Sequence, residues 1–299
     1  MERLACIGIG SNAIRLLIAC REGERLCALR RERRGTRLFA GLVNGALTQQ
    51  SIQSSVEAVG ELAALARADG ARELFIFATS AVRDATNGGK FTALAEAVSG
   101  ARVEIVTGEE EAVLSYLGAS EGGSCGVIDI GGGSTEFTLG EGAQILGVKS
   151  LQMGAVRMTA GQPILSEEDY VQTIERCMEI IDRDAQALLA MPARERWVGV
   201  GGTMTTLGAM QRGIPLFDPQ TCEGMTITRD EVARWGMSLA RMTMERRRHV
   251  AGLMPHRADI IPSGVAILEA AMRCFDVEEL RLSAHGNMDG YLKRRFGLA

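Results

Sequence analysis

One short motif occurs twice in this sequence, at positions 121 residues apart (128 − 7). Residues 7–12 read Ile-Gly-Ile-Gly-Ser-Asn, and residues 128–133 read Ile-Asp-Ile-Gly-Gly-Gly. Each copy joins two apolar runs of the kind that form strands. A repeat at this spacing predicts two domains of similar fold, because each copy begins a full set of secondary-structure elements.

Both halves of the sequence predict three strands followed by alternating helices and strands. In the first half the strands fall at 4–8, 13–20, 26–33, 74–78 and 103–106, and the helices at 52–66, 90–98 and 109–119. A Gly- and Ser-rich link at 120–124 follows. In the second half we expect strands at 126–130, 135–139, 145–151 and 197–200, a long helix at 166–189, and another beginning at 228–231. The sequence therefore predicts an α/β fold with domains at 1–120 and 121–299.

Composition excludes several classes of function. The 299 residues include 33 basic and 37 acidic side chains and only 4% aromatics, which disfavours a nucleic acid polymer or an anionic membrane as partner. Charges interrupt every apolar stretch within about ten residues, short of the roughly 20 that a membrane helix needs. The seven cysteines contain no Cys-x-x-Cys pair, which argues against a zinc site. No signal-peptide pattern opens the chain, and we expect a cytoplasmic location.

Two basic clusters stand out, at 30–34 with Arg37 and at 246–249. A solvated strand or helix end is the usual interpretation of such runs. Binding of a polyanion is the alternative, since the net charge of −4 means that local groups would have to hold it.

The first glycine turn, at residues 8–13, superficially fits a dinucleotide-binding fingerprint. That fingerprint needs a helix after the glycines, whereas residues 14–18 are typical of a strand. A glycine turn between antiparallel strands can still direct backbone N–H groups at an anion.

The second turn carries more chemistry, because carboxylates lie on both sides of it. Asp129 precedes Gly131, Gly132 and Gly133, and Glu136 follows them. Two carboxylates beside a phosphate-binding loop suit Mg²⁺, which prefers a few carboxylates, waters and phosphate oxygens. The structural alternative is a glycine-rich hairpin with a capping Asp.

Three further segments can act on phosphate. Arg83 follows two hydroxyl residues after a strand and can hold a phosphate bidentately, or it can pair with a nearby acid. Glu111 lies in the first turn of a helix, where acidic residues are often structural, yet a carboxylate there can also orient an attacking water. Gly201, Gly202 and Thr203 lead from a strand into a helix N-terminus, a general anion site.

Together these motifs resemble the exopolyphosphatases and guanosine pentaphosphate phosphohydrolases of the actin-like superfamily. The resemblance spans nearly the whole chain and rests on residues 10–12 with Arg15, 37–45, 78–83, 108–112, 128–136, 154–157, 199–207 and 257–261.

The resemblance implies two actin-like (ribonuclease H-like) domains with a ligand cleft between them, and Mg²⁺-dependent removal of terminal phosphate by water. It implies Glu111 as the catalytic base, with Glu136 as a second catalytic residue, and Asp129 and Glu136 as metal ligands. The phosphate-binding residues would be Gly10, Ser11, Asn12, Arg15, Arg83, Gly131, Gly132, Gly133, Ser134, Thr135, Gly201, Gly202 and Thr203. A homodimer is usual in the family.

Two departures from the family pattern bear on activity. Gly8 stands where the family has Asp, and Met288 stands where an Arg is usual in a Gly-Leu-Arg-Glu-Gly segment. The repeat pairs Gly8 with Asp129, so we expect Gly8→Asp to raise Mg²⁺-dependent activity.

These observations favour a phosphohydrolase that acts on inorganic polyphosphate, guanosine pentaphosphate (pppGpp) or both. The alternative is a catalytically weakened regulator that binds polyphosphate or guanosine penta- or tetraphosphate, because the first-loop Asp is Gly8. A phosphate-transferring kinase of the same superfamily is a third hypothesis.

Overall fold

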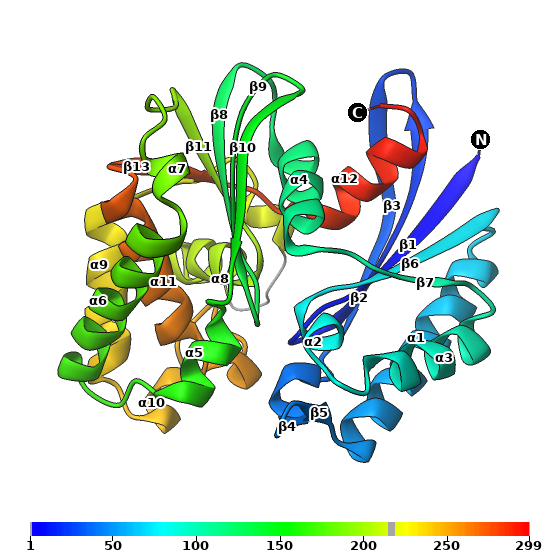
Figure 1. Ribbon diagram of the computed structural model, residues 1–299, viewed down its shortest axis with the longest axis horizontal. Helices are drawn as coiled ribbons and strands as arrows, with labels where there is room; N and C mark the ends of the chain where they lie inside the picture. Colours follow the sequence, from blue (N-terminus) through cyan, green and yellow to red (C-terminus); the bar gives the residue numbers. More distant parts are fainter. Residues whose placement is uncertain (1, 215–218, 299) are drawn as a thin grey trace. The chain divides into compact units, whose positions relative to one another are not determined.

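The computed structural model describes residues 2–214 and 219–298 and divides the chain into two compact units. Unit 1 consists of Met1–Gly118 together with Asn287–Ala299, and unit 2 consists of Ala119–Gly286. Each unit is built on a mixed β-sheet with helices packed against it (Figure 1). The predicted α/β fold class with two domains is confirmed.

Unit 1 has a five-stranded sheet in the order β3-β2-β1-β6-β7. Strands β1 to β3 form an antiparallel meander, and β6 and β7 continue the sheet parallel to β1. Helices α1 and α3 lie on one side of this sheet and α12 on the other (Figure 1). The elements are β1 (Arg3–Ile9), β2 (Ile14–Glu22), β3 (Arg25–Arg34), a 3₁₀ turn (Leu38–Gly41), β4 (Leu42–Val43), β5 (Ala46–Leu47), α1 (Gln49–Ala68), β6 (Glu73–Ala78), α2 (Ser80–Arg83), α3 (Gly88–Ser99), β7 (Val103–Ile105), α4 (Gly108–Ala119) and α12 (Asn287–Arg295).

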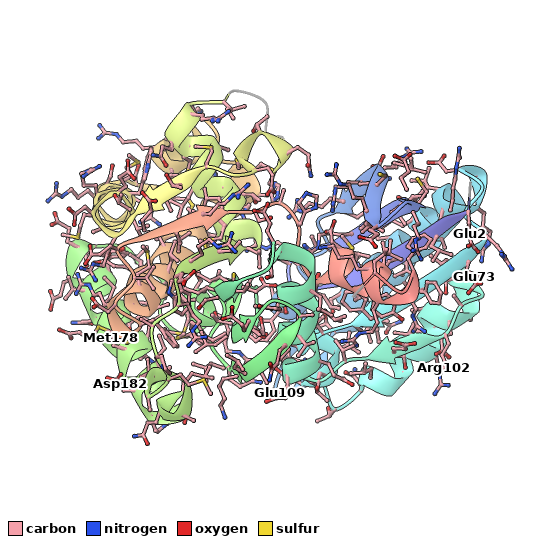
Figure 2. The ribbon with its side chains drawn as sticks, turned by 90° about the horizontal axis from the view of Figure 1, so that it is seen from above. Glu2, Glu73, Arg102, Glu109, Met178 and Asp182 are labelled. Atoms are coloured by element: carbon pink, nitrogen blue, oxygen red, sulfur yellow. The ribbon has the colours of Figure 1, made fainter. Side chains whose placement is uncertain are left out.

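Unit 2 has a six-stranded sheet in the order β10-β9-β8-β11-β13-β12. Helices α6 and α9 pack against the buried helix α11 (Figure 1). On α6, Met178 packs against this core and lies one turn from Asp182 (Figure 2). The elements are β8 (Ser124–Ile130), β9 (Thr135–Glu141), β10 (Gln144–Leu151), α5 (Ala155–Gly161), α6 (Glu167–Asp184), α7 (Gln186–Leu189), β11 (Arg196–Val200), α8 (Gly202–Arg212), 3₁₀ turns (Pro219–Cys222 and Pro255–Arg257), β12 (Thr226–Thr228), α9 (Arg229–Arg241), α10 (Met244–Arg248), α11 (Ile261–Cys274) and β13 (Glu279–Leu282).

The parallel strands of unit 1 give the sheet two chemically different ends. Strands β1 and β6 start side by side, with Glu2 and Glu73 at the same end (Figure 2). The glycine turn after β1 and the helix after β6 are at the opposite end, where the carboxyl ends of the strands meet. Open α/β sheets bind their ligands at that end.

The two copies of the repeat form the same structure. In unit 1 the Gly10 N–H donates to the Ala13 carbonyl (3.1 Å), and in unit 2 the Gly131 N–H donates to the Ser134 carbonyl (3.0 Å). Each turn joins an antiparallel pair of strands that is followed by a third. The repeat therefore predicted a real duplication of the strand meander.

The last helix departs from the expected domain at 121–299, because α12 belongs to unit 1. Its residues Met288, Tyr291 and Leu292 complete an apolar cluster on the sheet with Leu17 and Phe77. Burial of these side chains gives the helix its place in unit 1.

Smaller differences concern secondary structure in unit 2. The expected helix at 166–189 is interrupted at Ala185, where the backbone leaves the helical region (φ −118°, ψ 18°). Strands β12 and β13 were not predicted from the sequence. Within residues 2–214 and 219–298, no helix has the length and apolarity needed to cross a bilayer.

Candidate functional site

The turn between β1 and β2 brings together predicted polar residues of unit 1. The hydroxyl oxygens of Ser11 and Ser80 lie 2.8 Å apart, so the turn contacts the start of α2. Both side-chain amide atoms of Asn12 are buried and have no hydrogen-bond partner among the residues that the structure describes. Buried amides are almost always paired, so this side chain is expected to bind a polar ligand or an ordered water.

The acidic run at the start of α4 separates into structural and buried members. Glu110 and Thr107 form a reciprocal cap: the Glu110 N–H donates to Thr107 Oγ1 (3.1 Å), and the Thr107 N–H donates to Glu110 Oε2 (2.7 Å). Glu109 and Glu110 are exposed, whereas Glu111 is buried. The helix period therefore directs only Glu111 into the unit.

Arg83 lies beside a nearby acid, the structural alternative that the sequence left open, and that acid is Glu111. Arg83 Nη1 lies 3.7 Å from Glu111 Oε2 and donates to the Val106 carbonyl (3.0 Å). That carbonyl bond fixes the guanidinium beside the carboxylate. The site in unit 1 thus has a buried carboxylate and a cation that can contact phosphate.

Arg15 approaches the same carboxylate through Asn287. The Arg15 Nη2 group donates to Asn287 Oδ1 (3.1 Å), and Asn287 Nδ2 donates to Glu111 Oε1 (3.3 Å). Arg33 lies opposite Arg15 on the neighbouring strand, and its pKa is lowered by burial and by the Arg15 charge. Positive charge is concentrated on this face of the sheet.

Gly8 and Met288, the two departures from the family pattern, contact each other. A Cβ atom at Gly8 would lie 3.2 Å from Met288 Cγ and 3.3 Å from Phe77 Cζ. Position 8 faces the apolar cluster under α12, directly opposite Arg15 in the strand register. Met288 therefore covers the face onto which a longer side chain at position 8 would project.

In unit 2 the predicted carboxylates lie on neighbouring strands. Asp129 and Glu136 are opposite each other in the β8–β9 register, so their side chains share a face of the sheet. Both are buried, and Glu136 Oε1 accepts a hydrogen bond from Ser150 Oγ (2.8 Å). The Cβ position of Gly201 lies 2.8 Å from Asp129 Oδ1, so a larger residue there would collide with the carboxylate.

The glycine turn of unit 2 rests on the start of α5. The N–H groups of Ala155 and Val156 donate to the carbonyls of Gly131 and Gly132 (3.0 and 2.8 Å), and Arg157 Nε donates to Gly133 O (2.6 Å). A side chain at Gly154 would collide with Gly132 and Gly133. These contacts fix the carbonyl oxygens of the turn.

The third glycine segment forms the start of α8. Gly201 is the N-cap, in a backbone region that favours glycine (φ 97°). A Cβ atom at Gly202 would lie 2.4 Å from Arg257 Nη1, so a guanidinium lies against this helix N-terminus. The predicted Thr203 is fully buried against Gly264.

Two other predicted side chains of unit 2 are also enclosed. Ser134 is 2% exposed, and the fully buried Thr135 donates its hydroxyl to the Met153 carbonyl. Thr135 therefore supports the turn from within the unit.

The sequence-based list of site residues omitted Asn287, Arg157 and Arg257. The last two lie in segments that carry the family resemblance, and this was the signal that could have identified them. Asn287 lies beside Met288 in a segment that departs from the family pattern, but nothing there indicated its contact with Glu111, which is far away in the chain.

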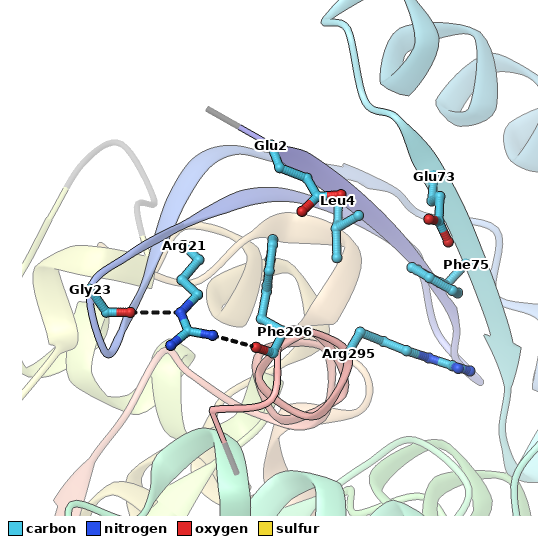
Figure 3. A pocket seen from close by; sticks show the side chains of 8 residues that line it. All are labelled: Glu2, Leu4, Arg21, Gly23, Glu73, Phe75, Arg295 and Phe296. Carbon is cyan, nitrogen blue, oxygen red and sulfur yellow. Dashed lines mark hydrogen bonds between the residues drawn. The ribbon is translucent and has the colours of Figure 1, made fainter.

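A cavity of about 610 Å³ in unit 1 lies away from these residues, at the starts of β1 and β6 (Figure 3). Arg21, which lines it, donates to the carbonyls of Gly23 (2.7 Å) and Phe296 (3.0 Å). This basic group is engaged in holding the end of the chain against β2.

Comparisons with known proteins identify the family of this chain. The model of the Ppx/GppA phosphatase family matches residues 17–296. Exopolyphosphatase 2 of Mycobacterium tuberculosis is 33% identical, over 97% of each chain. The structure of the Aquifex aeolicus PPX-GPPA enzyme is similar, with a TM-score of 0.82 at 28% identity over 97% of this chain and 98% of that chain. The crystal structure of an exopolyphosphatase-like protein has a TM-score of 0.89 at 26% identity, over 98% of this chain and 99% of that chain.

The chain belongs to the Ppx/GppA phosphatase family, and it is a hydrolase.

Proposed function

We propose that this enzyme removes terminal phosphate from inorganic polyphosphate and from guanosine pentaphosphate in a Mg²⁺-dependent reaction with water. The observation that carries the proposal is the buried Glu111 carboxylate, 3.7 Å from the Arg83 guanidinium at the carboxyl end of the unit 1 sheet. The name of the Mycobacterium tuberculosis relative supports polyphosphate as substrate. Guanosine pentaphosphate rests on the family resemblance of the motifs.

The glycine segments suit the phosphate groups of such a substrate. Because α5 binds the carbonyls of the turn and the Gly131 N–H closes the turn on Ser134, the amides of Gly132 and Gly133 are the ones that the turn can present to an anion. The N-terminus of α8, with Arg257 beside it, offers a second set of N–H groups. In unit 1 the buried Asn12 amide supplies donors that no described residue uses.

The donor set of unit 2 fits Mg²⁺. This ion is usually held by one or two carboxylates together with waters and substrate phosphates, and Asp129 and Glu136 supply two carboxylates on one face. The described part of the chain has no group of three or more His, Cys, Asp or Glu residues that could hold a metal alone. When bound, Mg²⁺ would neutralise charge on the transferred phosphate.

In the mechanism we propose, Glu111 accepts a proton from a water molecule, whose oxygen forms a bond to the terminal phosphorus. The bond from that phosphorus to the bridging oxygen breaks, and the electron pair leaves with the shortened chain. Arg83 contacts the phosphate oxygens on which negative charge increases. Glu111 then returns its proton to the solvent.

The second candidate function is a regulator that binds the same ligands and hydrolyses them slowly. The contact between Gly8 and Met288 favours it, because an apolar side chain faces the position of the family's first-loop Asp. Under this alternative, wild-type protein binds polyphosphate tightly and releases phosphate only slowly.

The test is phosphate release from medium-chain polyphosphate and from guanosine pentaphosphate, with and without Mg²⁺, for wild type and Glu111→Gln. We expect Glu111→Gln to lower kcat by about 10²- to 10⁴-fold, the usual contribution of a general base. Calorimetry with polyphosphate should show nearly unchanged binding.

Glu110→Gln is the matched control, since Gln also closes a capping box and Glu110 is exposed. This variant should keep wild-type kcat. Undiminished release by Glu111→Gln would disprove its role, and tight binding without release by the wild type would establish the regulator.

A further inference from the structure

Asn287 connects two residues of the unit 1 site, Arg15 and Glu111, by hydrogen bonds. It is the first residue of α12, it is 4% exposed, and it is 176 residues from Glu111 in the sequence. Its side chain accepts from Arg15 and donates to Glu111. One neutral amide thus lies between a cation and the proposed general base.

The chemistry of the two partners determines the orientation of this amide. An arginine can only donate hydrogen bonds, and an ionised glutamate can only accept them. The Asn287 oxygen must therefore face Arg15, and its nitrogen must face Glu111. Arg15 holds the amide in the orientation that Glu111 requires.

Helix α12 is anchored along α4, the helix that carries Glu111. A Cβ atom at Gly290 would lie 1.9 Å from the Leu114 carbonyl oxygen, so the helices touch at the backbone. Lys293 Nζ donates to the Leu117 carbonyl (2.8 Å). From Asn287 through Gly290 to Lys293, the contacts advance by three residues on both helices, which keeps Asn287 aligned with Glu111.

We propose that Asn287 is a positioning residue that holds Glu111 Oε1 and so orients the carboxylate for proton abstraction. The inference rests on the proposed function, in which Glu111 is the general base. Oε1 is bound by the amide, while Oε2 is on the side of Arg83. A neutral donor orients a carboxylate while lowering its basicity less than a second arginine would.

The test compares Asn287→Leu with Asn287→Asp by steady-state kinetics on polyphosphate over a range of pH. Asn287→Leu removes both hydrogen bonds, and we expect kcat to fall by about 10- to 100-fold with little change in KM. Asn287→Asp can still accept from Arg15 but cannot donate to Glu111. Near Glu111, the new carboxylate joins the charges of Arg83 on α2, which lies 3.7 Å from Glu111 Oε2, and of Arg15 on β2, which reaches Glu111 through residue 287.

Because a like charge raises the pKa of a carboxylate, the acidic limb of the kcat profile of Asn287→Asp should move to higher pH. Tyr291→Phe is the matched control, since it removes a hydrogen bond from α12 to Glu104, away from Glu111. This control should keep wild-type kcat and profile.

Glu111→Gln, measured in parallel, separates this inference from the proposed function. If Glu111→Gln is inactive while Asn287→Leu keeps kcat within twofold, only the positioning role is wrong. If Glu111→Gln is active, the proposed function itself fails. Should Asn287→Leu not fold, a profile of Asn287→Asp that superimposes on that of the wild type would overturn the inference.

Discussion

The first turns of the two units have the same backbone and opposite chemistry. In unit 1 the residues opposite each other across the turn are Gly8 and Arg15, and in unit 2 they are Asp129 and Glu136. Each unit 2 residue is 121 positions after its unit 1 counterpart (129 − 8 and 136 − 15). One geometry therefore carries a cation in unit 1 and two carboxylates in unit 2, so the side chains at two positions decide which ion each turn suits.

The surroundings of each pair reinforce this difference. Arg33 adds a second positive charge beside Arg15, in register on the next strand. In unit 2 the corresponding neighbour of Glu136 is the neutral Ser150, which donates to it. We infer that the side chains beside the unit 1 turn favour phosphate and that those beside the unit 2 turn favour a divalent cation, while the backbone amides of the unit 2 turn remain available to phosphate.

Asp129→Asn should have the largest effect, because it removes charge from the turn that we assign to the cation. Loss of metal assistance is worth several kcal/mol, so we expect kcat/KM for polyphosphate to fall by at least about 100-fold. The half-saturating Mg²⁺ concentration should rise. An unchanged Mg²⁺ titration curve would contradict the division between the turns.

Arg15→Met should have a smaller effect of a different kind. Removal of one charge-assisted contact to phosphate is expected to raise KM for polyphosphate by about tenfold, and kcat should fall as well, because Arg15 also holds the Asn287 amide that positions Glu111. The half-saturating Mg²⁺ concentration should not change, since Arg15 lies in the other turn. If Arg15→Met changes both KM for polyphosphate and the half-saturating Mg²⁺ concentration, the side chains of the two turns do not bind phosphate and cation separately.

Gly8→Asp tests whether unit 1 can be given the chemistry of unit 2. From the repeat alone, this change is expected to raise activity, but the Cβ position 3.2 Å from Met288 Cγ changes the expectation. The new side chain has to displace Met288 and would also pair with Arg15 across the strands. We expect about 1–3 kcal/mol of lost stability and no gain in activity.

The double variant Gly8→Asp with Met288→Ala should lose less stability than the sum of the two single losses, because truncation of Met288 costs core packing but removes the clash with position 8. Thermal unfolding of the single and double variants checks this. If Gly8→Asp alone keeps wild-type stability and has higher Mg²⁺-dependent activity, the expectation drawn from the repeat is correct and the effect of Met288 is not.

Much of the fold was predictable because its signals are local. The two turns, the meanders and α4 follow from patterns of apolar residues and glycines within about ten positions. Glu111 was singled out by the family resemblance, and the structure adds that the helix period buries it and leaves Glu109 exposed.

The basic clusters show where local patterns were insufficient. On β3 the strand period directs Arg31 to Asp289 on α12, while Arg30 binds Glu32 and Asp69 on the other face. In the second cluster, Arg247 is buried and donates to the carbonyls of Leu239 and Ile164, and this burial lowers its pKa. A solvated run was therefore the wrong expectation for Arg247. Its side chain is buried because the guanidinium binds two carbonyls from segments that are distant in the sequence.

The pairing of Asn287 with Glu111 was not predictable at all. Nothing near residue 287 indicates whether this helix of nine residues packs on the sheet of unit 2, which precedes it in the sequence, or on the sheet of unit 1. The choice depends on the apolar face that β1, β2 and β6 leave open to Met288, Tyr291 and Leu292.

The placement of α12 also has a consequence for biosynthesis. While the ribosome is still translating unit 2, the sheet of unit 1 exposes the surface that Met288, Tyr291 and Leu292 later cover. Glu111 likewise lacks its contact with Asn287 until then. A nascent chain that stalls before residue 287 therefore has an unfinished first domain, and the unit 1 site is completed only when α12, which follows all of unit 2 in the sequence, has been made.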